Sequence, residues 1–524
     1  MKKNKLFITI LSLSAFSGLW AQHNDLDVHL YICDITLNDN NDTIYVKETI
    51  EFKAIEDGVH HLDLIQVDAT GKGMIITEHD AKSLIHKNNI VSFEPSQNAL
   101  DPSIKTLSIS YKGIPANGLI IGKNKFGDRT FFADNWPNRA RNWLACNDHP
   151  SDKAFINFTV SAPSHYECVA TGLLDAKTEQ NNITTWKYTC HDLLPTKVMV
   201  IGVATMEIKE LETNFSFPLS SWVYPQDAKN ISDMDVAVDV LTYFQELIAP
   251  YPFEKLANVQ STTMFGGMEN AGNIFYDEKA INGKHTMDAL IAHEIAHQWF
   301  GNSASEIDWD HIWLSEGFAT YFADLFMGHQ HGEEIFIQRL KKERKQVIQF
   351  YDRQATPIVE QDPKNLMNLL NPNSYQKGAW VLHMLRNKIG DEAFFKGIRN
   401  YYEKYQFGNA KSADLQKEME SASGTDLMTF FMQWLYEAGQ PELYLEWKQK
   451  KSKAHISVRQ QQNHFLFEFP LEVRLEYTDG SIEDKIFQFG LNQKEVTLDF
   501  KEKKKIKSII LDPNTKLLYD RIGA

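Results

Sequence analysis

The amino-acid sequence predicts an α+β multidomain protein with an N-terminal antiparallel β-domain, a mainly helical middle domain and a small C-terminal β-sandwich. Its 524 residues exceed what one hydrophobic core usually organises. Short β-rich runs alternate with turn residues from about 25 to 215, helical spacing of apolar residues follows from near 234 to about 436, and a two-residue period then returns. These changes predict domains at 22–215, 216–440 and 441–524.

Residues 1–21, "MKKNKLFITILSLSAFSGLWA", predict a cleaved signal peptide. Three lysines precede an apolar run at 6–13, and small residues follow it. The alternative, a membrane anchor, is disfavoured because serines interrupt the run and it is too short to span a bilayer. No cysteine follows the predicted cut before Gln22, so no lipid attachment is expected. We expect an exported protein, periplasmic or secreted, with no stable membrane insertion.

In the first domain, runs such as "TIYVKETIEF", "TLSISYKG" and "AFINFTVSAP" have the β-branched and aromatic composition of strands. "ECVATGLL" and "TTWKYTC" lie on either side of the polar "TEQNN" and predict a hairpin. Cys168 and Cys190 flank it, so a disulfide between them and two free buried thiols both remain open. Only four cysteines occur, which excludes a disulfide scaffold.

The spacing of apolar residues along the chain predicts the secondary structure of the middle and last domains. "MDVAVDVLTYFQELIAPYPFEKL" carries apolar residues at helical spacing and ends at Pro250 and Pro252, which a helix does not tolerate. In "FPLEVRLEYTDGSIEDKIFQF" apolar and polar residues alternate before an Asp-Gly turn, the pattern of a β-hairpin.

The formal net charge of -15 disfavours polyanionic partners. We therefore expect no nucleic-acid partner. The basic run "KEKKKIK" at 501–507 is typical of a solvated strand edge. The oligomeric state does not follow from the sequence.

The stretch "IAHEIAHQWFGN" at 291–302 carries the strongest chemical signal. On a helix, His293 and His297 lie on one face, where both rings can reach one ion. Catalytic zinc takes three protein ligands, and Glu316, nineteen residues after His297 in "WDHIWLSEGFATYF", is the candidate third. The alternative is a core helix with satisfied histidines, which the added Glu316 makes improbable.

Glu294 lies about 100° around the helix from His293, so its side chain is expected to point past the metal. A carboxylate there suits a general base, because zinc lowers the pKa of a bound water toward neutrality. In "TTMFGGMENAGN", Gly266 and Gly267 permit close backbone approach and Glu269 is a possible anion in the cleft. Tyr375 in "NSYQKGAWVLHMLR" is a candidate donor to a developing oxyanion.

Together these motifs resemble the zinc gluzincin aminopeptidases, the family of aminopeptidase N and leukotriene hydrolase. "GGMEN" at 266–270 is similar to the family's Gly-Ala-Met-Glu-Asn motif, "HEIAH" with Glu316 to its zinc site, and "WDHIWLSEG" to the leukotriene hydrolase branch. The resemblance implies a thermolysin-like catalytic domain between the two β-domains.

The resemblance also implies roles for individual residues. His293, His297 and Glu316 would bind one Zn²⁺ ion, Glu294 would act as the base and Tyr375 would stabilise the tetrahedral intermediate. Glu269 would hold the free α-amine of a peptide substrate. The substrate-binding set is then Gly266, Gly267, Met268, Glu269 and Asn270.

Three departures from the family pattern limit this transfer. Relatives often have a Gln or Glu in the first domain that contacts the amine, whereas this chain has Trp136, with Asp134 or Asn135 as possible substitutes. Many relatives have an acidic residue seven positions after the third ligand, where this chain has Ala323 and then Asp324. Relatives usually continue into a large helical domain, so a more open active site is expected here.

The leading hypothesis is an exported zinc aminopeptidase that acts on peptides with a free N-terminus. A zinc endopeptidase is the alternative within enzymes, and a catalytically silent peptide-binding protein is the alternative outside them. Cleavage of N-acetylated peptides would distinguish the first two.

Overall fold

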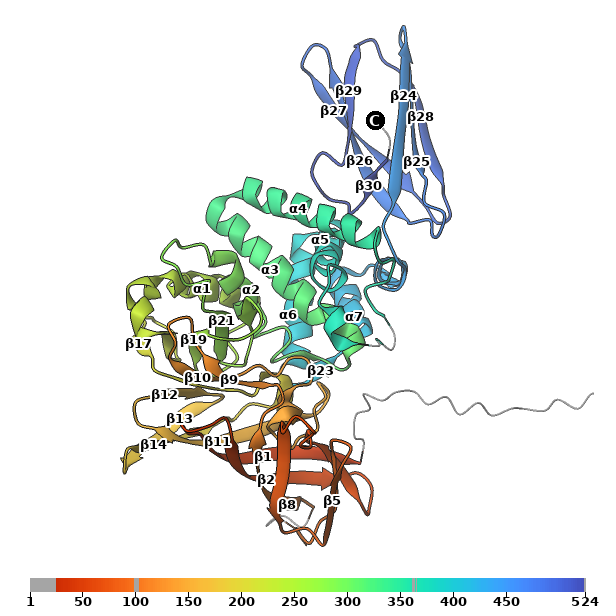
Figure 1. Ribbon diagram of the computed structural model, residues 1–524. Helices are drawn as coiled ribbons and strands as arrows, with labels where there is room; N and C mark the ends of the chain where they lie inside the picture. Colours follow the sequence, from red (N-terminus) through yellow and green to blue (C-terminus); the bar gives the residue numbers. More distant parts are fainter. Residues whose placement is uncertain (1–24, 99–102, 361–362, 364, 523–524) are drawn as a thin grey trace, which may run out of the picture.

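A computed structural model describes residues 25–98, 103–360, 363 and 365–522. The predicted signal peptide lies outside these residues. Along the chain, a β-rich region is followed by a region dominated by helices and then by two sheets (Figure 1). This order agrees with the multidomain α+β architecture expected from the sequence.

The N-terminal region contains three sheets. The largest has the strand order β13-β14-β11-β1-β2-β8-β4, with β15 on β11 and β7 on β8, and the smaller ones are β12-β16-β10-β9 and β3-β6-β5. Their bounds are β1 Leu26–Thr36, β2 Ile44–Ala54, β3 His60–Asp63, β4 Gly73–His79, β5 Ser83–Lys87, β6 Ile90–Glu94, β7 Gln97–Asn98, β8 Lys105–Ile114, β9 Leu119–Lys123, β10 Arg129–Ala133, β11 Lys153–Pro163, β12 Glu167–Ala170, β13 Leu173–Gln180, β14 Ile183–Thr189, β15 Leu194–Pro195 and β16 Ile201–Ala204.

The prediction of a purely antiparallel N-terminal domain is wrong at one pair of strands. β1 and β11 run parallel, with Leu30 opposite Phe155 and Thr36 opposite Ser161. Alternation of apolar residues reports which face of a strand is buried, but not the direction of a neighbour more than a hundred residues away. The other pairs in this sheet are antiparallel, including the predicted hairpin of β13 and β14.

The hairpin does not carry a disulfide. Cys168 and Cys190 are both buried free thiols, as are Cys33 and Cys146. Burial raises the pKa of the Cys190 thiol to about 12, so it stays protonated at neutral pH.

Strand β2 of the large sheet carries a buried carboxyl group, that of Glu48. It accepts hydrogen bonds from the Tyr111 hydroxyl at 2.7 Å and the Ala145 amide at 3.0 Å. Burial nevertheless raises the pKa of Glu48 to about 7. The folded state therefore holds this proton more tightly than the unfolded state. Because of this difference, Glu48 makes the free energy of unfolding decrease as pH rises from about 4.5 to 7.

Replacing Glu48 by glutamine removes this ionisation and keeps an oxygen for both donors. We expect the stability of Glu48→Gln relative to wild type to increase by about 2.5 kcal/mol between pH 5 and pH 8. The thermal unfolding midpoints of both proteins at the two pH values provide the measurement. An identical difference in midpoint at pH 5 and pH 8 would show that Glu48 does not titrate in this range.

The middle region combines a mixed sheet with helices, which the helical pattern alone did not indicate. The sheet has the order β17-β18-β19-β21-β20, with β20 at its edge. The predicted boundary at 215 and 216 falls in the loop between β17 and β18, which are paired with each other. The bounds are β17 Glu207–Glu210, β18 Leu219–Val223, β19 Leu256–Ser261, β20 Gly267–Met268 and β21 Asn273–Asp277, with β22 Ser305–Glu306 and β23 Asn409–Ala410 forming a separate pair.

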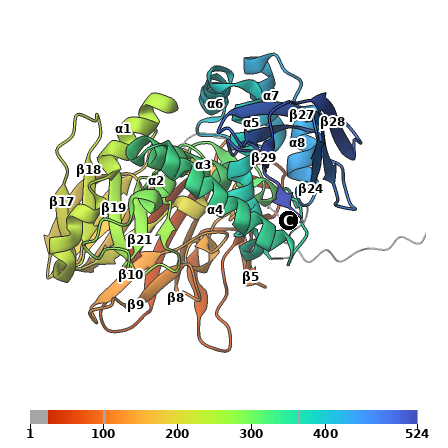
Figure 2. The same ribbon diagram turned by 90° about the horizontal axis from the view of Figure 1, so that it is seen from above.

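The helices of this region are packed beside the sheet and on one another (Figures 1 and 2). α1 illustrates why they form, because its buried residues recur at helical spacing at Ala237, Val240, Leu241 and Phe244. The bounds are α1 Ala237–Leu247, α2 Asp288–Ala296, α3 Trp313–His331, α4 Glu333–Tyr351, α5 Gly378–Ile389, α6 Asp391–Tyr405, α7 Ser412–Ser423 and α8 Met428–Phe431. None of the helices among the described residues is both long and apolar enough to cross a membrane.

The C-terminal region consists of two sheets that face each other in Figure 1, with the orders β28-β25-β24-β30 and β27-β26-β29. The predicted Asp-Gly turn at 479–480 joins β26 and β27. The basic run at 501–507 spans the connection from β28 to β29, where its lysines are exposed. The bounds are β24 Glu442–Lys450, β25 Lys453–Gln460, β26 Phe469–Tyr477, β27 Ile482–Phe489, β28 Glu495–Lys501, β29 Ile506–Leu511 and β30 Asp520–Arg521.

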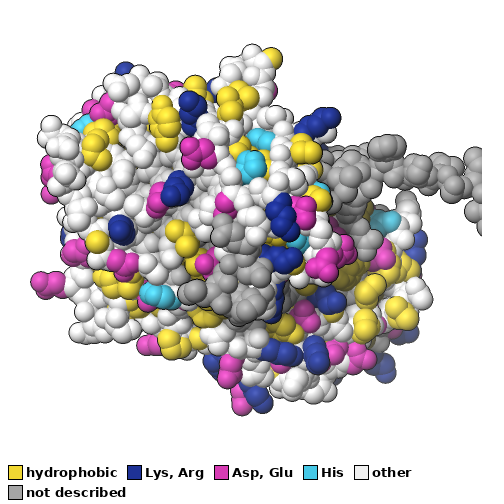
Figure 3. Space-filling model, turned by 90° about the horizontal axis from the view of Figure 1, so that it is seen from below, with side chains coloured by type: hydrophobic (Ala, Val, Ile, Leu, Met, Phe, Trp, Pro, Cys, Tyr) yellow, Lys and Arg dark blue, Asp and Glu magenta, His cyan; other side chains and the backbone are white. Residues whose placement is uncertain are grey.

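Charge is mixed on the surface drawn in Figure 3. On this face, Lys and Arg side chains are interspersed with Asp and Glu side chains.

Candidate metal and peptide-binding site

Two packed helices, α2 and α3, bring the three predicted metal ligands together. His293 lies in the last turn of α2, His297 directly follows that helix, and Glu316 lies in the first turn of α3. His297 and Glu316 are almost fully buried, whereas His293 keeps 18% of its side chain exposed. The cluster is therefore rigid on one side and open on the other.

The geometry of the three donor atoms fits a zinc ion. His293 Nε2 lies 3.1 Å from His297 Nε2, and Glu316 Oε2 lies 3.4 Å and 3.3 Å from these two nitrogens. Four ligands placed tetrahedrally around zinc are about 3.3 Å from one another. Glu316 Oε2 is buried and has no hydrogen-bond partner among the residues that the structure describes, so a cation between the three atoms would satisfy it.

The electrostatics of the cluster favour a cation as well. Although burial opposes it, the Glu316 carboxylate raises the pKa of His297 to about 9. The same pairing holds the pKa of Glu316 well below its usual range, against the effect of burial. Burial lowers the pKa of His293, and the positive charges of His297 and Arg339 add to this lowering.

The outer partner of His297 is a serine, which the sequence interpretation missed. His297 Nδ1 lies 3.0 Å from Ser315 Oγ and 3.2 Å from the Phe300 carbonyl oxygen. Such partners orient the ring of a metal-binding histidine. Gly301 lies behind them with a φ of 119°, and a Cβ there would be 2.2 Å from Ser315 Oγ. The only signal in the sequence was the position of Ser315, immediately before the third ligand.

Asp324, considered from the sequence as an outer partner of a ligand, pairs with Arg339 of α4 instead. Its neighbour Ala323 lines the cavity described below. The outer sphere of this site is therefore built from a hydroxyl and a backbone carbonyl around His297.

Glu294 lies on the expected side of α2, facing β20. Its carboxyl group occupies the space that a side chain at Gly267 would take, since a Cβ there would be 2.2 Å from Glu294 Oε1. Burial raises the pKa of Glu294 well above its usual value, and the charges of Glu269 and Glu316 add to this effect. A carboxylate of this kind is suited to accept a proton.

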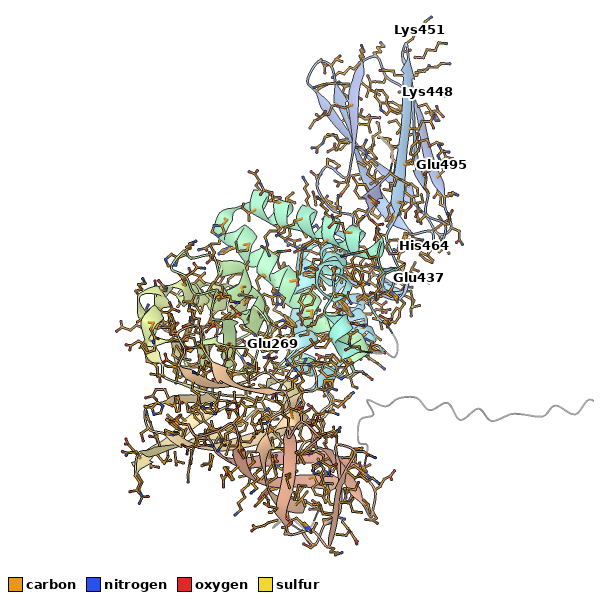
Figure 4. The ribbon with its side chains drawn as sticks, in the orientation of Figure 1. Glu269, Glu437, Lys448, Lys451, His464 and Glu495 are labelled. Carbon is orange, nitrogen blue, oxygen red and sulfur yellow. The ribbon has the colours of Figure 1, made fainter. Side chains whose placement is uncertain are left out.

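Glu269 follows β20 and faces the same centre. Its carboxylate, that of Glu294 and a ring nitrogen of His297 each offer an atom within 4.8 Å of the others. Glu269 is 5% exposed, and its Oε1 has no hydrogen-bond partner among the described residues. Figure 4 places Glu269 between the N-terminal strands and the helices.

The backbone of Glu269 is held by the segment that follows the second histidine. Its carbonyl oxygen accepts hydrogen bonds from Gln298 Nε2 at 2.8 Å and Asn302 Nδ2 at 2.6 Å. Gln298 and Asn302 come from "HQWFGN", directly after α2. These bonds tie the Glu269 loop to the segment that directly follows α2.

Tyr375 approaches from a third element, a π-helical turn at Asn373–Lys377 that precedes α5. Its ring is stacked on that of His293, with centroids 5.9 Å apart and planes 10° apart. Burial and the nearby Glu316 charge raise the pKa of Tyr375 well above its usual value. It is therefore a neutral phenol that can donate a hydrogen bond.

One cavity of about 480 Å³ is lined by the predicted metal ligands and their neighbours, namely His293, His297, Glu316, Glu294, Glu269 and Tyr375. Of the predicted substrate-binding set, Gly266, Gly267, Met268 and Glu269 line it. Asn270 is fully buried and is not among the described lining residues, because the chain turns into the interior after Glu269.

The first domain contributes Trp136 to this cavity. Asp134 and Asn135 are not available to contact a ligand there. Asp134 is buried and pairs with Arg139, while Asn135 donates to the Thr196 and Met199 carbonyls. Glu269 therefore remains as the acidic group at this end of the cavity.

A further part of the cavity wall was not anticipated from the sequence. It is formed by α4, through the side chains of Arg339, Lys342, Glu343 and Gln346. The basic run "RLKKERK" at 339–345 was the available signal, but its orientation depends on how α4 packs on α3.

An H-E-x-x-H helix completed by a glutamate from the next helix defines the gluzincin class of metal sites. Residues 232–434 match the peptidase family M1 domain, and this segment contains every metal-site residue described above. Residues 232–434 thus carry a peptidase M1 domain, in agreement with the resemblance.

Similar proteins carry aminopeptidase names. Glutamyl aminopeptidase of Sus scrofa is 27% identical over 373 residues, covering 66% of this chain and 39% of that protein. Aminopeptidase M1-A of Oryza sativa subsp. japonica is 30% identical over 334 residues, covering 60% and 38%. Leucyl aminopeptidase of Saccharolobus solfataricus is 22% identical over 486 residues, covering 87% and 60%. The chain thus covers less than two thirds of each of these relatives.

Proposed function

We propose that the protein is a zinc-dependent aminopeptidase that hydrolyses the N-terminal peptide bond of peptides. The observation that carries this proposal is Glu269, a buried carboxylate with an unpartnered oxygen, beside the cluster of His293, His297 and Glu316. A carboxylate in that place pairs with an α-ammonium group and sets the first peptide bond at the metal site.

His293, His297 and Glu316 would hold one Zn²⁺ ion, which supplies an activated water at neutral pH and polarises the scissile carbonyl. Glu294 takes a proton from the attacking water on its carboxylate and delivers it to the leaving amine. Tyr375 donates its hydroxyl proton in a hydrogen bond to the oxyanion as it develops.

β20 orients the peptide. It is the edge strand of its sheet, so its outer backbone groups are free to pair with an extended chain. Gly266 and Gly267 bring that backbone close to the substrate. Trp136 also lines the cavity and packs edge-on against Phe265, next to Gly266, where we expect it to limit the space beyond the amine.

The test is a panel of aminoacyl-coumarin substrates with free and N-acetylated amines, assayed with a zinc chelator and after zinc is restored. We expect chelator-sensitive release from the free amines and at least a hundredfold slower release from the acetylated series. Equal rates in the two series would support an endopeptidase, and no release with zinc bound would support a non-catalytic peptide-binding protein.

Asn302 positions Glu269 through its backbone carbonyl. Replacing it by alanine removes one of two donors to that oxygen, a loss of about 1.4 kcal/mol or tenfold in binding. We expect Asn302→Ala to raise KM for free-amine substrates about tenfold with a smaller change in kcat. Zinc content should equal that of wild type, and an unchanged KM would remove this positioning role.

The proposed location is outside the cytoplasm, in a periplasm or the medium, on the basis of residues 1–21. The proposed domain limits remain 22–215, 216–440 and 441–524. Amino-terminal sequencing of the mature protein tests the first proposal, with a start at Gln22 expected.

A further inference from the structure

The cavity extends from Glu269 past the metal cluster to α4. Its lining includes Thr320 and Ala323 of α3 and side chains of α4, and α4 lies on the side of α3 away from Glu269 in Figures 1 and 4. If the amine of a peptide lies at Glu269 and its first carbonyl at the cluster, the rest of the peptide points toward α4. The chemistry of α4 therefore decides which downstream groups are accepted.

Arg339 offers donors on this wall. Its Nε bonds to Asp324, and no hydrogen bond from its two terminal nitrogens is found among the described residues. The side chain is 31% exposed, so these nitrogens are accessible from the cavity. The pairing with Asp324 fixes the plane of the guanidinium group and leaves one edge free.

Lys342 is one turn further along α4. It is exposed at the cavity wall, and it forms no ion pair or hydrogen bond with another described residue. The neighbouring Glu343 is buried, and burial together with the Asp324 charge raises its pKa well above the usual value. This shift favours the neutral form of Glu343, which opposes the charge of Lys342 less than an ionised carboxylate would.

The two ends of the cavity therefore have opposite character in a chain whose net charge is -15. One end presents the acid Glu269, and the other presents Lys342 and the free edge of Arg339. A short peptide has the complementary arrangement, with an ammonium group at one end and a carboxylate at the other.

We propose that Lys342 and Arg339 bind the C-terminal carboxylate of short peptides, so that the protein acts preferentially on small peptides with both ends free. This inference rests on the proposed function for the placement of the amine. In this proposal α4 selects short peptides with a free C-terminal carboxylate, a selection that the metal site alone does not provide.

The experiment measures binding separately from turnover. The zinc-loaded Glu294→Gln variant is titrated by calorimetry with alanine peptides of two to five residues, each as the free acid and as the C-terminal amide. We expect the acid to bind about tenfold more tightly than the amide at one optimal length, because a charge-assisted pair is lost in the amide. The preference should decrease at high ionic strength.

Second substitutions in the same background locate the effect. Lys342→Gln should bring the ratio of acid to amide affinity close to one, Lys342→Glu should reverse it, and Lys342→Arg should preserve it. Lys345→Gln is the matched control, since Lys345 is an exposed lysine on α4 outside the cavity lining.

Equal affinity for acid and amide at every length, or no binding of either, would overturn the proposal. A preference that survives Lys342→Gln would also overturn it, by removing α4 from recognition. The coumarin assay of the wild-type protein reports the proposed function independently, so failure of catalysis and failure of carboxylate recognition give different results.

Discussion

Replacement of Glu294 by glutamine is expected to lower kcat/KM about 10³-fold, the usual contribution of a general base. Glutamine has nearly the same shape and fits the space beside Gly267, but its amide cannot accept the proton from water. The change should appear in kcat, since Glu269 still holds the amine. Steady-state kinetics with a free-amine substrate provide the measurement.

The control is Glu333→Gln, the same chemical change in the exposed first turn of α4. Zinc content and the unfolding midpoint of Glu294→Gln should match those of wild type. A rate within threefold of wild type would mean that another group accepts the proton.

Replacement of Glu316 by glutamine is expected to have the second large effect, through loss of the metal. The carboxylate is the anionic member of the donor set, and its Oε2 lies 3.3 to 3.4 Å from both histidine nitrogens. An amide presents a neutral oxygen or an N–H donor there, so zinc affinity should decrease at least a hundredfold. Activity should decrease in parallel and recover partly at high zinc concentration.

Zinc per chain is measured after dialysis against a zinc buffer, together with activity in the same samples. Glu334→Gln, an exposed position in the first turn of α4, is the matched control. Full zinc occupancy in Glu316→Gln would exclude Glu316 as a ligand.

Local sequence was sufficient for the metal cluster because helix geometry relates positions four apart. His293 and His297 had to share a face once the segment formed a helix, and Glu294 had to point elsewhere. Glu316 was found by its fixed distance from that helix. Glu269 and Tyr375 were candidates from their residue types and neighbouring motifs, and the resemblance to the gluzincin aminopeptidases gave them specific roles; both line the same cavity.

Residues whose contacts depend on packing between separate segments of the chain could not be predicted from local sequence. Asn270 was grouped with its neighbours in "GGMEN", although the chain turns inward after Glu269. Ser315 became a partner of His297 only through the packing of α3 on α2. Asp134 and Asn135 were candidates for the amine, but ion pairing and backbone hydrogen bonds hold both elsewhere.

The sequence by itself predicted the order of β-rich, helical and β-rich regions, the grouping of His293, His297 and Glu316 beside Glu294, and the resemblance to the zinc gluzincin aminopeptidases. Each of these depends on periodicity or spacing within a short stretch, where helix or strand geometry fixes the side on which each side chain lies. Only the tertiary structure decided that β1 and β11 run parallel and that Arg339 and Lys342 of α4 line the same cavity as Glu269. Such relations join segments far apart in the chain, and long-range packing sets them rather than any local pattern.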